Sequence, residues 1–322
     1  MPAVITFLEN HDLKKLDLGE EVKAGLLSDA ANIPSKFFYD LLGSKLFEVI
    51  TLIPEYYLTR TEAEILNTHL SDIALEAGRH TTFIDLGAGN CRKAAGLFDA
   101  LEPKTYIAVD ISVDFLKEIL PQLQAQHPAI DMIGVGVDFS SKLDLPPSVD
   151  QNKRVFFYPG SSLGNFNDEQ AATLLKQIHH QAQGGGLLLG IDLWKDERLL
   201  KLAYDDPLKI TAAFNLNVLK NVNALIGSDF MIEDFCHHIE INPQLHRVEM
   251  HLEAQKDVTV SWPNQKRHFN KGERIHTENS HKYTIEKIKH LLTDAGFKHL
   301  KIWTDPNHYF AVIYAHSNNR FD

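Results

Sequence analysis

The stretch FIDLGAGNCRK, Phe83 to Lys93, decides the fold of this 322-residue chain. Its first four residues are apolar apart from one acid and predict a buried strand. The glycine turn Gly87-Ala88-Gly89 comes next, and a helix carrying Ala94, Ala95, Leu97 and Phe98 is expected after it. Glycines let the backbone approach a ligand closely, and a helix N-terminus offers unpaired N–H groups. The stretch therefore predicts a nucleotide-binding strand–turn–helix unit.

The kind of nucleotide is indicated by two further residues. A second apolar strand, Tyr106 to Val109, ends in Asp110 about 20 residues later, where an acid accepts hydrogen bonds from ribose hydroxyls. The dinucleotide fingerprint requires a third glycine where this chain has Arg92, which disfavours an NAD-dependent oxidoreductase. An acidic strand end followed by Gly-x-Gly is typical of an S-adenosylmethionine (SAM) site. Taken alone, the motif is also compatible with an ordinary strand–helix turn.

The composition describes an ordinary soluble globular protein, with 44% apolar and 23% charged residues. A net charge of −11 disfavours nucleic acid as a partner, because phosphate contacts need clustered basic residues. No apolar run is long enough to span a membrane, and the N-terminus lacks the build of a signal peptide. With only two cysteines, far apart in the chain, a reduced cytoplasmic protein without a membrane partner is expected, and we take it to be a monomer.

A metal site is not expected from the sequence. Cys91 and Cys236 lie far apart, without metal-like spacing. The 17 histidines include the pairs His179-His180 and His237-His238, but neither pair has the i, i+4 spacing of a helical metal site, and no HExxH motif occurs.

Strands and helices alternate regularly through the middle of the chain. Strands are expected at Thr82–Gly87, Thr105–Ser112, Met132–Ser140, Arg154–Pro159 and Gly186–Trp194, with helices between them, such as Val113–Gln126 and one capped by Asn167. Near-continuous apolar strands between helices predict a parallel sheet covered on both faces. Right-handed crossovers place the carboxyl ends of these strands, and so the ligand, along one edge.

The alternation stops after Trp194 and resumes at Thr284. A last helix on Ile285 to Ala295 and a hairpin of His299–Trp303 and Tyr309–Ala315 complete the ground plan of class I SAM-dependent methyltransferases, a Rossmann-like α/β sheet. Residues 61–196 plus 284–322 are the predicted methyltransferase domain. Residues 1–60 plus 197–283 are the predicted substrate-binding α+β lobe, packed over the cofactor edge.

The lobe has weaker patterns of its own. They predict an amphipathic helix over Leu41–Ile50, a helix near Asp205–Leu225, and short strands around Met250 and Val260. A further helix, from Arg60 to Ala74, is expected at the start of the methyltransferase domain and leads into its first core strand.

Three further stretches fall at the predicted ligand edge or in the lobe. Asp138-Phe139 follows the third strand and suits an adenine amino group and ring, while YPGSSLGNF, Tyr158 to Phe166, follows the fourth. The lobe segment Ala203 to Phe230 is rich in asparagine and aromatic residues. Each has a structural alternative, as helix caps or connectors. Their gathering at one edge of one sheet favours a ligand site.

Five motifs carry a resemblance to a known family. FFYDLLGSKLFEVITLIPEYYLTRTEAEIL, FIDLGAGNCRK, SSLGNF, AAFNLNVL and HTENSHKY resemble the L-histidine Nα-methyltransferase family of ergothioneine biosynthesis, in order and through nearly the whole chain. The PEYY-TRTE and AAFNLNVL segments lie outside the generic SAM core and are specific to that family. The resemblance implies trimethylation of the α-amine of free L-histidine to hercynine, with SAM converted to S-adenosylhomocysteine.

The resemblance also implies the site residues. SAM is placed on Gly87, Lys93, Asp110, Asp138 and Phe139. The substrate amine and carboxylate are placed near Tyr39, Gly160, Asn165 and Tyr204, and the imidazole near Tyr56, Glu278 and Ser280, with Met250 closing the pocket. Tyr39 is the candidate catalytic residue, because a tyrosine face suits the growing positive charge of a methylated amine.

Two alternatives remain beside this interpretation. A relative acting on another free amino acid such as tryptophan is expected to lose Glu278, which this chain keeps. A SAM-binding regulatory protein without catalysis is disfavoured by the glycine turn and the lobe motifs together.

Overall fold

The computed structural model describes residues 5–9, 15–139, 143, 145, 149–150 and 153–318. The chain divides into two compact units, each discontinuous in sequence. The first comprises the described parts of Met1–Asp12, Leu58–Trp194 and Lys282–Asp322. The second comprises the described parts of Leu13–Tyr57 and Lys195–His281.

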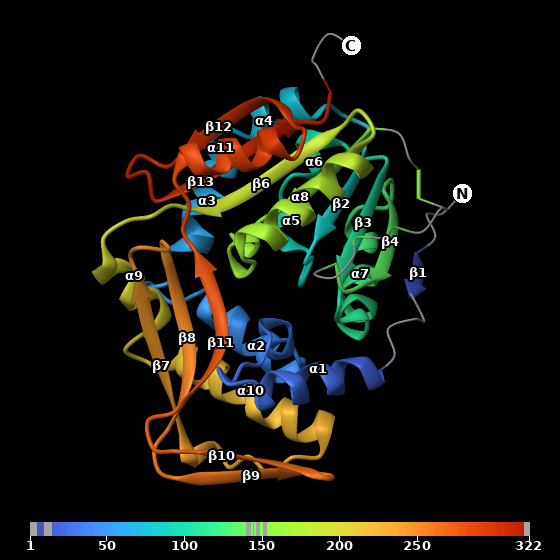
Figure 1. The fold of residues 1–322 in the computed structure, drawn as a ribbon. Coiled ribbons are helices and arrows are strands. Elements are labelled where there is room, and N and C mark those ends of the chain that lie inside the picture. The colour runs from blue at the N-terminus through green and yellow to red at the C-terminus, as the bar shows by residue number, and fades with distance from the viewer. Residues whose placement is uncertain are drawn as a thin grey trace. The chain divides into compact units, whose positions relative to one another are not determined.

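An eight-stranded sheet forms the centre of the first unit, in the order β1-β4-β3-β2-β5-β6-β13-β12 (Figure 1). The strands are β1 (Thr6–Glu9), β2 (Thr82–Leu86), β3 (Thr105–Asp110), β4 (Asp131–Gly136), β5 (Arg154–Tyr158), β6 (Gly186–Asp192), β12 (Lys298–Thr304) and β13 (Phe310–His316). Strands β1 to β6 are parallel, and β13 runs antiparallel to both of its neighbours. The predicted class I methyltransferase sheet is confirmed.

Strand β1 corrects the predicted assignment of residues 1–60 to the lobe. Thr6–Glu9 pairs in parallel with β4 and so belongs to the large sheet. The segment has only four residues, so local periodicity could not reveal a strand whose stability comes from its pairing with β4.

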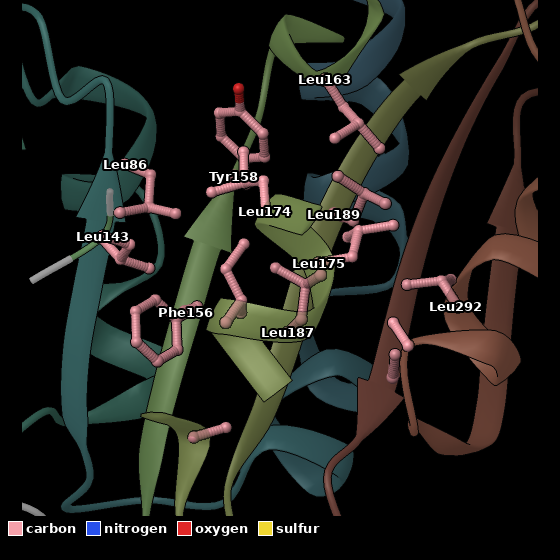
Figure 2. Packing of buried hydrophobic residues seen from close by; sticks show 14 of the residues in the cluster. Leu86, Leu143, Phe156, Tyr158, Leu163, Leu174, Leu175, Leu187, Leu189 and Leu292 are labelled. Atoms are coloured by element: carbon pink, nitrogen blue, oxygen red, sulfur yellow. The ribbon is translucent and has the colours of Figure 1, made fainter. Parts of the chain in front are cut away.

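Helices cover both faces of the sheet. They are α3 (Tyr57–Thr68), α4 (Leu70–Ala77), α5 (Arg92–Ala95), α6 (Phe98–Leu101), α7 (Val113–Gln126), α8 (Asp168–Ala182) and α11 (Ile285–Asp294). Leucines of α8 and α11 pack with alternate residues of β5 and β6 into one buried core (Figure 2). Asn167 caps α8 as expected, because its side chain accepts the Gln170 N–H while the Gln170 side chain accepts the Asn167 N–H.

Several elements are shorter than the sequence predicts. The helix expected from Arg60 to Ala74 is two helices, because His69 leaves the helical conformation between α3 and α4. The helix after the glycine turn is likewise split, at Gly96, into α5 and α6. Strand β4 ends at Gly136 instead of Ser140. No helix occurs among the described residues between β4 and β5.

The second unit contains four α-helices, two short 3₁₀ segments, a hairpin and a three-stranded antiparallel sheet (Figure 1). Its elements are α1 (Lys15–Leu27), η1 (Ser35–Phe38), α2 (Leu41–Ile50), α9 (Glu197–Tyr204), α10 (Ile210–Ile226), η3 (Ile232–Asp234), β7 (Phe235–Asn242), β8 (Arg247–Ala254), β9 (Val258–Trp262), β10 (Gln265–Phe269) and β11 (Arg274–His281). The helix expected near Asp205 begins at Ile210, since Asp206 accepts the N–H groups of Ile210 and Thr211.

One face of the sheet β11-β8-β7 carries a row of three histidines. His238, His251 and His276 are direct cross-strand neighbours. His251 is buried, and burial together with neighbouring His276 lowers its pKa to about 4 from an ordinary value of 6.5. Glu249 lies 3.3 Å from His251 and opposes that shift. His251 is therefore neutral in the folded protein near pH 7.

This row predicts acid sensitivity. Between pH 6.5 and about 4, His251 is protonated in the unfolded chain but stays neutral in the folded protein. The free energy of unfolding should therefore decrease by about 1–3 kcal/mol as the pH falls through that window. Urea unfolding at pH 7 and pH 4.5 measures the loss. The decrease in the free energy of unfolding between the two pH values should be smaller in His251→Phe than in wild type. It should be unchanged in His268→Phe, which replaces an exposed histidine on β10. Equal acid sensitivity of wild type and His251→Phe would contradict the assignment.

In the part of the chain that the structure describes, no helix has the length and apolar character needed to cross a bilayer.

Candidate active site

The glycine turn after β2 leaves the backbone open to a ligand. Gly87 and Gly89 have φ values of +71° and +50°, which favour glycine, and Gly87 N–H donates to the Val109 carbonyl at 2.8 Å. A Cβ atom on Gly87 would lie 3.9 Å from the ring of Phe139. Two predicted cofactor residues, one after β2 and one after β4, are therefore neighbours.

Asp110 ties this turn to the end of β3. Its Oδ2 atom accepts the Gly89 N–H and its Oδ1 atom accepts the Ser112 N–H, both at 2.9 Å. Burial raises the pKa of this carboxyl, and the backbone hydrogen bonds oppose that shift. Each carboxylate oxygen can accept more than one hydrogen bond, so Asp110 keeps acceptor capacity for a ribose diol. A fixed carboxylate beside a turn of two glycines and an alanine fits the nucleoside part of SAM.

Replacing Asp110 with alanine should weaken SAM binding by about 1.5–3 kcal/mol, the range for hydrogen bonds to a charged group. Titration calorimetry measures the change, with circular dichroism to verify folding. Asp114→Ala is the matched control, because the Asp114 side chain is 99% exposed in the first turn of α7. Unchanged SAM affinity in folded Asp110→Ala would refute this role.

Asp85 lies within β2, beneath the turn. It is 2% exposed, and its Oδ2 atom accepts the Tyr106 hydroxyl at 2.8 Å. Burial raises the pKa of Asp85 to about 7, and the Tyr106 hydrogen bond opposes the shift. The strand of the decisive motif thus carries a carboxyl that titrates near neutral pH.

Glu62 contacts two predicted site residues, Lys93 and Gly160, and was not itself predicted from the sequence. Its carboxylate is 1% exposed, and it accepts the Lys93 ammonium at 2.6 Å and the Gly160 N–H at 2.8 Å. A Cβ atom on Gly190 would clash with it, so a glycine of β6 makes room for this acid. Lys93 and Gly160, predicted for different ligands, are therefore held by one side chain. The sequence did offer an indication, because Glu62 is the glutamate that ends the family-specific TRTE segment.

Glu62→Gln should lower both stability and SAM affinity by about 1–2 kcal/mol. The glutamine oxygen can still accept the Gly160 N–H, but the amide loses the charge that holds Lys93, whose side chain is 35% exposed. Denaturant unfolding and calorimetry measure the two losses. Glu64→Gln, an exposed acid two residues along α3, should change neither. Wild-type SAM affinity in Glu62→Gln would show that Lys93 does not depend on this pair.

The remaining predicted residues of the first unit follow strand ends. Asp138 is 7% exposed, and the Phe139 ring contacts Tyr158 edge-on, with centroids 5.9 Å apart. Asn165 is the last residue of the 3₁₀ turn η2 (Ser162–Asn165) and is half-buried. The Ser161 Oγ atom accepts the Asp192 N–H at 2.9 Å, which joins this turn to the end of β6.

Three predicted substrate residues of the second unit share one aromatic cluster. The Phe47 ring lies 5.8 Å from Tyr39 and 6.2 Å from Tyr56, and Tyr56 lies 6.3 Å from Tyr204. The Phe214 ring lies 5.8 Å from Tyr39. Phe47 and Phe214 come from two of the quoted family motifs but were not singled out from the sequence. Such a cluster offers ring faces to a cation.

The other three lie on β8 and β11. Met250 is the direct cross-strand neighbour of Glu278, at an irregularity in the β8–β11 register between His276 and Glu278. Met250 is buried and Glu278 half-buried. The Ser280 Oγ atom lies 2.7 Å from the Tyr204 hydroxyl, so β11 and α9 meet through a hydrogen bond.

Asparagines of α10 hold this unit together. Asn217 donates to Asp40 at 2.7 Å, next to Tyr39, and Asn221 donates to the Phe37 carbonyl at 2.7 Å. These side chains connect residues that are about 180 positions apart, a connection that sequence spacing cannot predict. Among the described residues, no group of three or more His, Cys, Asp or Glu side chains is placed to hold a metal ion.

Comparisons with known proteins agree over the length of both units. The family model described as histidine-specific methyltransferase, SAM-dependent, matches residues 18–317. The histidine N-alpha-methyltransferase of Mycolicibacterium smegmatis is 37% identical over 296 residues, which cover 90% of this chain and 91% of that protein. The Mycobacterium tuberculosis protein of the same name is 35% identical over 301 residues, covering 91% and 93%. Ergothioneine biosynthesis protein 1 of Neurospora crassa is 31% identical over 299 residues, which cover 90% of this chain and 34% of that protein.

Proposed function

Because this chain belongs to the family of histidine-specific, SAM-dependent methyltransferases, we propose that it methylates the α-amine of free L-histidine. Three successive transfers from SAM would give the trimethylammonium product hercynine and three molecules of S-adenosylhomocysteine. The product is a betaine, whose quaternary nitrogen has no further lone pair to methylate.

The observation that carries this proposal is the pairing of Glu278 with Met250 on neighbouring strands, two residues before Ser280. A half-buried carboxylate beside an apolar side chain suits a ligand that is planar and has an N–H donor, as imidazole does. The Tyr204–Ser280 hydrogen bond places two hydroxyls near the same strand. Indole also has one ring N–H, but it cannot become a cation as imidazole can, so it gains less from an anionic acceptor.

For the cofactor we propose Gly87, Lys93, Asp110, Asp138 and Phe139 as the SAM-binding residues. SAM, when bound, supplies a methyl group already activated by its sulfonium. Asp110 would accept from the ribose, while Asp138 and Phe139 would meet the adenine amino group and ring. Lys93 would present its ammonium from the position that Glu62 fixes.

For the substrate we propose that the chain aligns a neutral amine and tolerates the charge that grows on it. Asn165 and Tyr204 would hold the carboxylate as uncharged donors, with the Gly160 backbone nearby in sequence. Tyr39 would be the catalytic residue, since its ring meets the amine while that group gains methyl groups and a permanent charge. Tyr56 would complete the imidazole pocket. Alignment of reacting groups is the main contribution required of the protein.

We further propose a cytoplasmic monomer whose partner is the small molecule L-histidine. The net charge of −11 supports the absence of a nucleic-acid partner.

Incubation of the protein with methyl-deuterated SAM and a mixture of the common amino acids tests the function. Mass spectrometry should find one, two and finally three labelled methyl groups on histidine and none on other amino acids. A reaction without protein is the control. Labelled tryptophan would favour a relative with another substrate, and SAM binding without any labelled product would favour a regulatory protein.

A further inference from the structure

We propose that His237, Asn215 and Thr277 are positioning residues, which hold Tyr204 and the Glu278–Ser280 segment in place through a closed ring of hydrogen bonds. The inference rests on the proposed function, because Tyr204, Glu278 and Ser280 are its substrate residues. None of the three positioning residues belongs to the site predicted from the sequence.

The hydrogen bonds of His237 define its protonation. Its Nε2 atom lies 2.9 Å from the Tyr204 carbonyl oxygen, which can only accept, so Nε2 carries the proton. Its Nδ1 atom lies 2.8 Å from the Asn215 Nδ2 atom and accepts from that amide. Burial lowers the pKa of His237, which favours the neutral ring. The hydrogen bond to the Tyr204 carbonyl and the charge of Asp205 oppose this shift, while Lys209 and His238 favour it.

Asn215 extends the connection from α10 to two strands. It is fully buried, and its Nδ2 atom also donates to the His251 carbonyl of β8 at 3.0 Å. Its Oδ1 atom accepts the hydroxyl of Thr277, on β11, at 2.8 Å. Both amide hydrogens and the amide oxygen are therefore used, which fixes the orientation of the side chain.

Thr277 and Ser280 close the ring. Thr277 is 1% exposed and directly precedes Glu278. Its one hydroxyl hydrogen is shared between two acceptors, the Asn215 Oδ1 atom and the Met250 carbonyl oxygen, which lies 3.0 Å away. Three residues later, the Ser280 Oγ atom meets the Tyr204 hydroxyl at 2.7 Å. Tyr204 is thus held at its backbone by His237 and at its hydroxyl by Ser280. A fully satisfied buried network is rigid, and losing one member leaves its neighbours unpaired.

The ring explains the roles of a half-buried histidine and a fully buried asparagine that the proposed site does not otherwise use. Strand β11 presents Glu278 and Ser280 directly after the register irregularity between His276 and Glu278, where the ladder is locally interrupted. Asn215 and Thr277 supply the missing constraint from α10, and His237 transmits it to the last residue of α9. The network therefore sets the distance between the strand and the tyrosine that both contact histidine in the proposed site.

Steady-state kinetics and SAM calorimetry on His237→Phe, Thr277→Val and the double variant test the inference. Each single change should raise KM for histidine, about tenfold for His237→Phe and several-fold for Thr277→Val, with the Kd for SAM within twofold of wild type. The double variant should be less impaired than the product of the single effects, because the residues act through one network. His237→Gln, which can restore the donor to Tyr204, should recover part of the loss.

His238→Phe is the matched control, since His238 is the next residue on β7, points to the other face and should leave KM for histidine unchanged. Unchanged KM in both single variants, an equal rise in His238→Phe, or fully multiplicative effects would overturn the inference. A wild-type protein that does not methylate histidine would overturn the proposed function and this inference together. Wild-type turnover with unaffected variants would overturn the inference alone.

Discussion

Replacing Glu278 with alanine is expected to lower kcat/KM for histidine by about 2–4 kcal/mol, roughly 30- to 1,000-fold. The loss combines a charged hydrogen bond with an imidazole N–H left without an acceptor. A site built to hydrogen-bond its ligand discriminates far better than an apolar pocket. The same change should leave turnover of tryptophan unchanged or improve it, because Met250 and the shortened side chain then form an apolar surface.

The measurement compares kcat/KM for histidine and tryptophan in wild type and variant, with melting temperatures alongside. Glu253→Ala is the matched control, because Glu253 lies in the same three-stranded sheet and pairs with Arg274 at 2.8 Å. Glu253→Ala should leave the ratio of kcat/KM for histidine to kcat/KM for tryptophan unchanged. If Glu278→Ala lowers kcat/KM for histidine and tryptophan by the same factor, or if its melting temperature falls steeply, Glu278 has a structural role instead.

Lys282→Met is expected to lower the free energy of unfolding by about 3–5 kcal/mol, the usual cost of stranding one member of a buried ion pair. Lys282 Nζ lies 2.9 Å from Asp192 Oδ2, and both side chains are 0% exposed. Asp192 ends β6, and its N–H donates to Ser161. A stranded carboxylate here would also disturb the turn that carries Asn165.

Urea unfolding of Lys282→Met and of the double variant Lys282→Met/Asp192→Asn measures this cost. The double variant should be more stable than Lys282→Met, because the remaining group is then uncharged. Lys287→Met is the matched control: Lys287 pairs with Asp168 at 2.7 Å, but the two side chains are 35% and 64% exposed, so less than about 1 kcal/mol is expected. If Lys282→Met lowers the free energy of unfolding no more than Lys287→Met does, the buried ion pair is not important for stability.

The large sheet was predictable because its strands are locally distinctive. Buried parallel strands are apolar on both faces, and each of the five predicted strands overlaps one of β2 to β6. The closing hairpin was equally clear, and Asp305 stabilises its turn by accepting the N–H groups of Asn307, Tyr309 and Phe310. Strand β1 was missed because four residues at a sheet edge have no signal of their own. Helix α9 was missed because its eight residues lie where the regular alternation had ended.

For the candidate site, sequence reasoning reached the residues that the family motifs contain and missed those that act between motifs. Gly87 and Asp110 are recognisable because a turn and a strand end have sequence signatures. Glu62 is 98 positions from Gly160 and 31 from Lys93, and only the folded chain shows that it holds both. His237 looked like one member of a histidine pair, since its role depends on Asn215 and Tyr204, which come from two other helices.

The place of β13 in the sheet has a consequence for biosynthesis. It lies between β6 and β12 and pairs with β6 only after the entire second unit has been translated. A nascent chain that has emerged as far as His281 already holds every element of the second unit, whereas β6 still presents an open edge to the cell. We expect the second unit to fold first on the ribosome and the first unit to be completed last, when the C-terminal hairpin emerges. Until then, the unpaired edge of β6 is the part of the chain that most needs protection by a chaperone.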